Sequence, residues 1–159
     1  MRRNVRIALY QPDIPQNTGT ILRLGACLGV AVDLIGPTGF RTDDRALRRA
    51  GLDYLDRAAL TLHAGWEDFD AARQSIGGRL VLFTTRATQS FLDLTFEESD
   101  TLLFGRESAG VPDDIHAGAD IRTTIPMVEG TRSLNLAVSV AMGVTEALRQ
   151  TGGLPHPAS

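Results

Sequence analysis

Short apolar runs alternate along this chain with segments of helical pattern, and that alternation is the feature that most constrains its fold. The runs at 5–10, 31–35, 80–85, 101–104 and 121–125 have the length and composition of buried strands. Helices are predicted between and after them, at 17–28, 43–50, 66–75 and 134–150. Strand and helix in alternation predict an α/β fold with a mainly parallel sheet flanked by helices.

The length of the chain, 159 residues, suits one domain with a real core. We expect a single domain at 1–151 and a flexible tail at 152–159, because no linker or repeat divides the sequence. No apolar run is long enough for a membrane span, and the N-terminus lacks the pattern of a signal peptide. The single cysteine, Cys27, cannot form an internal disulfide, which favours the cytoplasm; its place on an apolar helix face favours a packing role.

The charge is unevenly distributed. The net charge is −3, yet residues 1–60 hold nine arginines against six aspartates, and the chain has no lysine. Arginine suits forked contacts to phosphate, although genomic base composition alone could exclude lysine. If the chain binds RNA, we expect a basic surface formed by Arg2, Arg3, Arg41, Arg45, Arg48 and Arg49, with binding that weakens steeply with salt.

The last predicted helix is apolar on most sides. Leu136, Val140, Val144 and Leu148 form one stripe, and Val138, Ala141 and Met142 add apolar surface elsewhere. A central core helix would explain this pattern. So would a second subunit covering one face, and we expect a homodimer.

Three polar segments follow predicted strands. The first, Pro15-Gln16-Asn17-Thr18-Gly19 leading to Arg23, has Asn17 or Thr18 as a candidate helix cap. The second is the 102–112 segment, with glycines at 105 and 110 around Glu107. The third is the 125–136 segment, in which Ser133 is a candidate N-cap and Asn135 could bond within the same turn. Each segment alone could be a capped helix or a tight turn.

Other chemistry has little support in the sequence. His63, His116 and His156 are scattered without metal-ligand spacing, so we expect no metal site. The second segment is neither a dinucleotide-binding fingerprint nor a nucleophile elbow. Trp66 is interpreted as a core residue, although it or Tyr54 could stack on a base.

Taken together and in order, the three segments resemble the motifs of the SPOUT superfamily of RNA methyltransferases. The matching patterns are Asn17-x-Gly19-x-x-x-Arg23, Phe104-Gly105-x-Glu107-x-x-Gly110-Val111-Pro112, and Ile125-Pro126-Met127 followed by Ser133-Leu134-Asn135. The stretches 14–19 and 48–54 are similar to the small branch that methylates the 2′-hydroxyl of the tRNA wobble nucleoside, cytidine or modified uridine. The chain departs from that branch at Ala137 and Thr145, which leaves the RNA contacts open.

The resemblance implies a C-terminal trefoil knot, a homodimer and S-adenosylmethionine as cofactor. Carried over by position, the cofactor-binding residues are Phe83, Thr84, Gly105, Glu107, Ile125, Ser133 and Asn135. Phe83 and Ile125 would act through main-chain groups, Glu107 would accept from backbone amides or the cofactor amine, and Asn17 and Asn135 would order the loops.

The resemblance also makes Arg23 the central catalytic residue, assisted by Asn17. Because a guanidinium has a pKa above about 12, we expect Arg23 to donate hydrogen bonds to the ribose oxygen and a phosphate rather than to remove a proton. Two alternatives stay open: a SPOUT enzyme acting on rRNA or another tRNA position, and an inactive knotted RNA-binding protein. The tRNAs used, the preferred nucleoside, any required prior modification and the proton acceptor also stay open.

Overall fold

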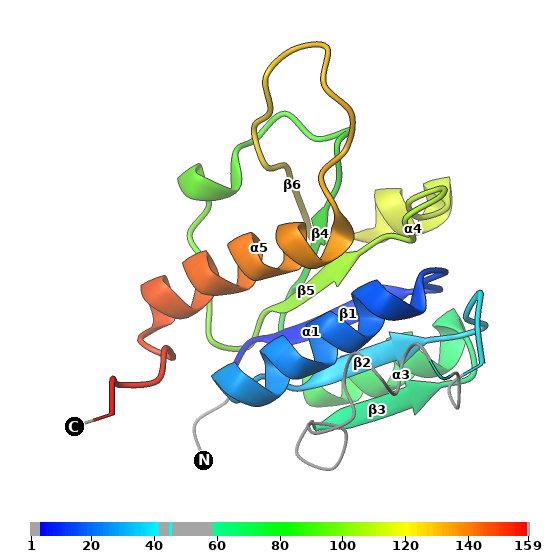
Figure 1. Cartoon of the computed structure of the whole chain (residues 1–159), viewed down its shortest axis with the longest axis horizontal. Helices are drawn as coiled ribbons and strands as arrows, with labels where there is room; N and C mark the ends of the chain where they lie inside the picture. Colours follow the sequence, from blue (N-terminus) through cyan, green and yellow to red (C-terminus); the bar gives the residue numbers. More distant parts are fainter. Residues whose placement is uncertain (1–3, 42–44, 46–58, 159) are drawn as a thin grey trace.

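The computed structural model describes residues 4–41, 45 and 59–158. In this part of the chain, six strands form one sheet with helices on both faces (Figure 1). The elements in chain order are β1 Arg6–Tyr10, α1 Pro15–Leu28, β2 Val32–Ile35, β3 Leu60–His63, α3 Trp66–Ile76, β4 Leu80–Phe83, the 3₁₀ turn η1 Phe91–Asp93, β5 Thr101–Phe104, α4 Asp113–Gly118, β6 Ile121–Thr123 and α5 Leu136–Thr151.

All strand pairs of the sheet are parallel, and the spatial order is β3-β2-β1-β5-β4-β6. The predicted α/β class and parallel sheet are therefore confirmed. Because the strands are parallel, the segments that leave β1, β4, β5 and β6 all start at one edge of the sheet. That edge is where open α/β sheets bind ligands.

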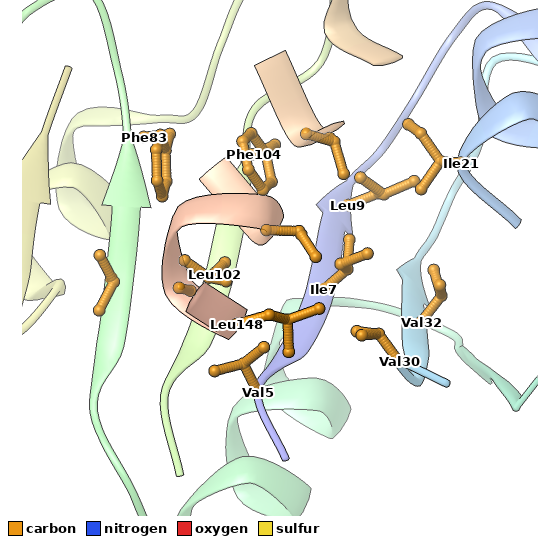
Figure 2. Close-up of a cluster of buried hydrophobic side chains, with 14 of the residues drawn as sticks. Val5, Ile7, Leu9, Ile21, Val30, Val32, Phe83, Leu102, Phe104 and Leu148 are labelled. Carbon is orange, nitrogen blue, oxygen red and sulfur yellow. The ribbon is translucent and has the colours of Figure 1, made fainter. Parts of the chain in front are cut away.

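The strand side chains alternate between two cores, as the period of a strand requires. Ile7 and Leu9 of β1 point to the α1 and α5 face, where Leu148 lies beside Ile7 and Ile21 lies beside Leu9 (Figure 2). Ala8 and Tyr10 point to the opposite face, against Phe69 of α3. The sheet is thus buried on both sides, which explains the nearly continuous apolar runs in the sequence.

Helix α5 lies over the sheet with the predicted stripe inward. Val140, Val144 and Leu148 are fully buried, and Leu136 nearly so. Gly143 allows close packing, because a Cβ there would lie 2.8 Å from the Phe83 ring. Val138 and Met142 stay 47% and 39% exposed, so part of the helix surface is apolar and uncovered in the single chain.

Both predicted helix caps are wrong. Helix α1 begins at Pro15, whose ring presets a helical φ, and no side chain caps it. Helix α5 begins at Leu136, two residues later than predicted, with Asn135 rather than Ser133 as N-cap. The Asn135 side-chain oxygen accepts from the backbone N–H groups of Ala137 and Val138. Asn17 is used for contacts with distant segments instead, as described below.

Three short elements have no counterpart in the prediction: β3, η1 and α4. The helix predicted at 43–50 lies outside the described residues except for Arg45. Cys27 is exposed rather than packed in the single chain, which corrects that expectation. Trp66 packs against Tyr10 and Phe69, as expected of a core residue. None of the described helices has both the length and the apolar character needed to cross a bilayer.

Candidate active site

A cavity of about 510 Å³ opens where β4, β5 and β6 end. Its walls come from the segments that follow these strands, from the start of α5 and from the start of α1. The volume lies within the roughly 300–1,000 Å³ of typical small-molecule sites. The structure brings every predicted cofactor-binding residue, together with Asn17, to this one cavity: Phe83, Thr84, Gly105, Glu107, Ile125, Ser133 and Asn135.

The loop after β5 closes on itself, and Gly105 is required for that closure. The backbone N–H groups of Arg106 and Gly110 donate to each other's carbonyl oxygens, at 3.1 and 2.9 Å. A Cβ at Gly105 would lie 2.6 Å from the Cα of Gly110, which is shorter than any ordinary contact. Gly110 itself has a φ of 66°, where other residues are strained. The two glycines therefore shape one wall of the cavity.

Glu107 ties this loop to the segment before α1. Its carboxylate accepts from the backbone N–H groups of Asp13 at 3.2 Å and Ile14 at 2.9 Å. The side-chain amide of Asn17 also donates to it, at 3.4 Å. Two partners were predicted for Glu107, backbone amides or the cofactor amine. The structure shows the contact with backbone amides.

Asp13 and Arg106 form a second contact between the loop after β5 and the segment before α1. The Ser108 hydroxyl donates to the carboxylate of Asp13, and Arg106 lies 3.5 Å from that carboxylate and 3.4 Å from the side-chain oxygen of Gln11. Burial would raise the pKa of Asp13, but the hydrogen bond from the Ser108 hydroxyl and the charge of the Arg106 guanidinium hold it below its usual value. Asp13 is therefore ionised at neutral pH.

The segment after β4 encloses the end of β6. Thr84 N–H donates to the carbonyl of Thr123, and Phe91 N–H donates to the carbonyl of Thr124. Thr124 N–H donates in turn to the carbonyl of Gln89. These contacts place Ile125, which follows directly, at the cavity wall beside the end of β4.

Of the predicted catalytic and RNA-binding arginines, the three that the structure describes, Arg23, Arg41 and Arg45, do not line the cavity. Arg23 is an exposed residue of α1, about 9 Å further along the helix axis than Asn17. Arg41 and Arg45 are exposed, as a phosphate-binding surface requires. Arg48 and Arg49, like Arg2 and Arg3, lie outside the described residues.

Several cavity residues were not among the predicted set, including Phe104, Arg86, His116 and Ser139. Phe104 belongs to the second motif and could have been included on that basis. His116 lies on α4, an element that the apolar pattern did not reveal. Nothing in the sequence around position 116 marks it as a residue of the cavity. Arg86 pairs with Asp113 at 3.0 Å at the exposed rim.

The parallel sheet, the ordered motifs and the cavity at the strand ends define a class of RNA-modifying methyltransferase. The family model described as the SpoU rRNA Methylase family matches residues 4–145, and the chain belongs to this family. Within the part of the chain that the structure describes, no cluster of side chains suited to holding a metal ion is found.

Close relatives agree with that assignment. A tRNA (cytidine(34)-2′-O)-methyltransferase of Beijerinckia indica is 56% identical over 93% of this chain and 92% of its own length. A solved structure described as giving insight into the 2-OH methylation of C/U34 on tRNA matches with a TM-score of 0.89 at 41% identity, covering 94% of this chain and 97% of that one.

A third comparison bears on the cofactor. The SpoU methyltransferase AviRb of Streptomyces viridochromogenes, solved in complex with AdoMet, matches with a TM-score of 0.83 at 25% identity. It covers 94% of this chain and 62% of that one. Like its family, this chain is an S-adenosylmethionine-dependent methyltransferase.

Proposed function

We propose that this chain transfers a methyl group from S-adenosylmethionine to the ribose 2′-oxygen of the wobble nucleoside, position 34, of tRNA. The observation that carries the proposal is the convergence of eight predicted site residues, the seven cofactor-binding residues and Asn17, on one cavity. The high identity to tRNA (cytidine(34)-2′-O)-methyltransferases over nearly the whole chain supports the choice of substrate. Cytidine and modified uridine are both within the proposal.

The cavity fits the cofactor by size and by chemistry. It combines apolar walls from Phe83 and Ile125 with polar groups from Ser133 and Asn135.

Phe83 and Ile125 would hold the adenine of the cofactor through main-chain groups, and Thr84, Gly105 and Ser133 would complete the pocket around it. When bound, S-adenosylmethionine supplies a methyl group on a positively charged sulfur, ready for attack by an oxygen. Glu107, Asn17 and Asn135 keep the surrounding loops in place through the hydrogen bonds described above. Positioning of the ribose oxygen by these loops would supply much of the rate.

Arg23 stabilises the negative charge that develops on the ribose oxygen, by donating hydrogen bonds to it and to a neighbouring phosphate. Because Arg23 does not line the cavity of its own chain, this role calls for a homodimer in which α1 of one copy approaches the cavity of the other. The exposed Val138 and Met142 on α5 support such an assembly. Asn17 acts as a positioning residue in this scheme.

The RNA backbone is bound by the basic surface that includes Arg41, Arg45, Arg48 and Arg49. Arg41 and Arg45 are exposed, which supports this assignment. The enzyme works without a metal ion, in the cytoplasm, where tRNA is modified. Binding that depends steeply on salt is expected from such a surface.

We further propose that residues 1–151 form a single domain with a C-terminal trefoil knot. Residues 152–159 then form a flexible tail. Gln150 of α5 donates to the carbonyl of Leu94 and accepts from Phe96 N–H, so α5 contacts the β4–β5 connection. Thr123 and Thr124, before α5, contact the same connection near Gln89. Contacts on both sides of one connection support a path in which the C-terminal segment passes through it.

The proposal is tested by incubating the purified chain with S-adenosylmethionine and unmodified tRNA, followed by mass spectrometry of the digested nucleosides. We expect a 2′-O-methylated nucleoside that maps to position 34. Methylation of rRNA or of another tRNA position would favour the first alternative. Failure to bind S-adenosylmethionine in calorimetry would favour an inactive RNA-binding protein.

A further inference from the structure

Arg86 lies at the mouth of the cavity and makes an ion pair that a ligand can replace. It belongs to the segment after β4 and lines the cavity. Its N–H donates to the Thr84 hydroxyl, and the Ala87 N–H donates to the Thr84 carbonyl, so a tight turn fixes its backbone. Its side chain is 56% exposed and lies 3.0 Å from the carboxylate of Asp113, whose side chain is 91% exposed. A pair so open to solvent contributes little to stability, so either charge can be exchanged for that of a ligand.

The guanidinium of Arg86 lies on the side of the cavity that α4 forms. Burial lowers the pKa of His116, and the positive charge of Arg86 lowers it further, so the guanidinium is near this histidine. His116 and Val111 both line the cavity. The Arg86 side chain is therefore accessible from solvent and adjacent to the cavity wall.

The other charged groups of the cavity already have partners inside the chain. Arg106 lies 3.5 Å from the ionised carboxylate of Asp13. Glu107 accepts from two backbone N–H groups and from the side-chain amide of Asn17. Among the described residues that line the cavity, Arg86 is therefore the charged side chain whose partner is almost fully exposed.

The cofactor carries one charge of each sign at its amino-acid end. In S-adenosylmethionine, a carboxylate and an ammonium group are both attached to the α-carbon. A guanidinium binds a carboxylate through two parallel N–H groups, and a carboxylate accepts hydrogen bonds from an ammonium group. Arg86 and Asp113, side by side at the mouth, present the charges that complement this end of the cofactor.

We infer that Arg86 binds the α-carboxylate of the S-adenosyl cofactor and that Asp113 binds its α-ammonium group. The inference rests on the proposed function, since it requires that the cofactor occupies this cavity. It leaves Glu107 to its contacts with backbone amides and gives the ammonium group a different partner. It also assigns a binding role to two residues that lie outside the three motifs.

The first test measures the affinity of S-adenosylhomocysteine, which keeps the amino-acid end, by titration calorimetry. We expect Arg86→Gln and Asp113→Asn each to weaken binding roughly 3- to 10-fold, the effect of losing one charged contact at a partly exposed position. Arg149→Gln, which breaks another surface ion pair, and Asp114→Asn, at the neighbouring exposed acid of α4, should bind like the unaltered chain. Unchanged affinity in Arg86→Gln or in Asp113→Asn would overturn the inference.

The second test removes the charges from the ligand instead. Decarboxylated S-adenosylhomocysteine lacks the carboxylate, and the deaminated analogue lacks the ammonium group. The penalty of Arg86→Gln should disappear with the decarboxylated analogue and persist with the deaminated one, because the lost contact is already missing in the first case. Asp113→Asn should show the reverse pattern. A penalty of Arg86→Gln that persists with the decarboxylated analogue would show that Arg86 acts on another group, and the inference would fail.

An RNA phosphate is the other anion that Arg86 could bind, and the affinity for tRNA separates the two. If Arg86→Gln kept its affinity for S-adenosylhomocysteine but bound tRNA more weakly and with a smaller salt dependence, Arg86 would serve the RNA and the inference would be wrong.

Methylthioadenosine, which lacks the amino-acid end, completes the comparison. It should bind equally to the unaltered chain, Arg86→Gln and Asp113→Asn, and a weaker binding to either variant would contradict the inference. If the unaltered chain binds neither methylthioadenosine nor S-adenosylhomocysteine, the proposed function fails together with the inference. Normal binding of S-adenosylhomocysteine by Arg86→Gln defeats the inference alone.

Discussion

The side-chain amide of Asn135 donates a hydrogen bond to the side-chain oxygen of Asn17, 3.0 Å away and 118 positions earlier in the sequence. Asn17 in turn donates to Glu107, so one chain of hydrogen bonds joins the three motif segments. The same Asn135 caps α5. One side chain therefore fixes both the start of a helix and the relation of that helix to the rest of the cavity.

Asn135→Ala should lower the free energy of unfolding by about 1–2 kcal/mol, since it removes the helix cap, and should also weaken binding of S-adenosylhomocysteine. Asn135→Ser is the matched control, because serine can cap a helix but is too short to reach Asn17. We expect Ser to restore stability without restoring affinity. Chemical denaturation and calorimetry measure the two effects, and recovery of both by Ser would count against the role of the Asn17 contact.

Gly105→Ala should disrupt the loop after β5, because the new Cβ would meet the backbone of Gly110 at 2.6 Å. We expect a loss of about 1–3 kcal/mol in stability and a marked loss of S-adenosylhomocysteine affinity. Gly118→Ala at the end of α4, where a Cβ would meet nothing within 4 Å, should change neither quantity. Normal affinity in Gly105→Ala would mean that this loop does not shape the cofactor pocket.

Arg23→Ala should keep the affinity for S-adenosylhomocysteine but reduce methylation of tRNA by about 100-fold or more, the usual effect of removing a group that stabilises transition-state charge. Thr20→Ala, an exposed position one turn earlier on α1, serves as control. Single-turnover rates and calorimetry separate the two effects. A collapse of cofactor affinity in Arg23→Ala would refute the assigned role.

Val138→Asp and Met142→Asp should convert a dimer to a monomer, because each places a charge on the uncovered apolar surface of α5. The expected mass change can be followed by light scattering during gel filtration. Leu154→Asp, at a partly exposed position beyond the helix, should leave the mass unchanged. An unaltered chain that is monomeric at micromolar concentration would exclude the dimer and, with it, the proposed approach of Arg23.

Glu146 makes stability depend on acid pH. Hydrogen bonds from Arg149 and Gln150 lower its pKa from 4.5 to about 2, against the opposing effect of burial. A carboxylate with a lowered pKa stabilises the fold fully above about pH 4.5, and that stabilisation is lost as the pH falls toward 2. Because solvent screens the pair, we expect Glu146→Gln to cost about 1 kcal/mol at pH 7.

The difference between Glu146→Gln and the unaltered chain should shrink as urea unfolding is repeated at decreasing pH. Glu129→Gln, an exposed loop position, should show no such dependence. A difference that stays constant from pH 7 to pH 2.5 would show that the charge of Glu146 does not contribute to stability.

The sheet was predictable because its strands are buried on both faces and leave long apolar runs. The strand β3 escaped prediction because Thr61 and Leu62 are exposed at the edge of the sheet, so no apolar run marks it. The helix caps were predicted wrongly for a different reason. A polar residue near a helix start can bond locally or at long range, and only the fold decides, as Asn17 illustrates.

The cavity residues were predictable as a group because three ordered motifs resemble a known superfamily. Their spacing alone did not place them together in space. The resemblance could not identify His116, which belongs to no motif. It also could not show that Arg23 lies outside the cavity wall of its own chain, because that depends on the length and direction of α1.

The walls of the cavity come from both ends of the sequence, from Ile14 before α1 to Ser139 in α5. A ribosome makes these residues in order, so a nascent chain cannot possess a finished pocket until residue 139 has left the exit tunnel. Products of early termination, even those with every strand of the sheet, would lack Asn135 and its bond to Asn17. Chains that end before residue 135 therefore lack both part of the cavity wall and the contact that holds its segments together.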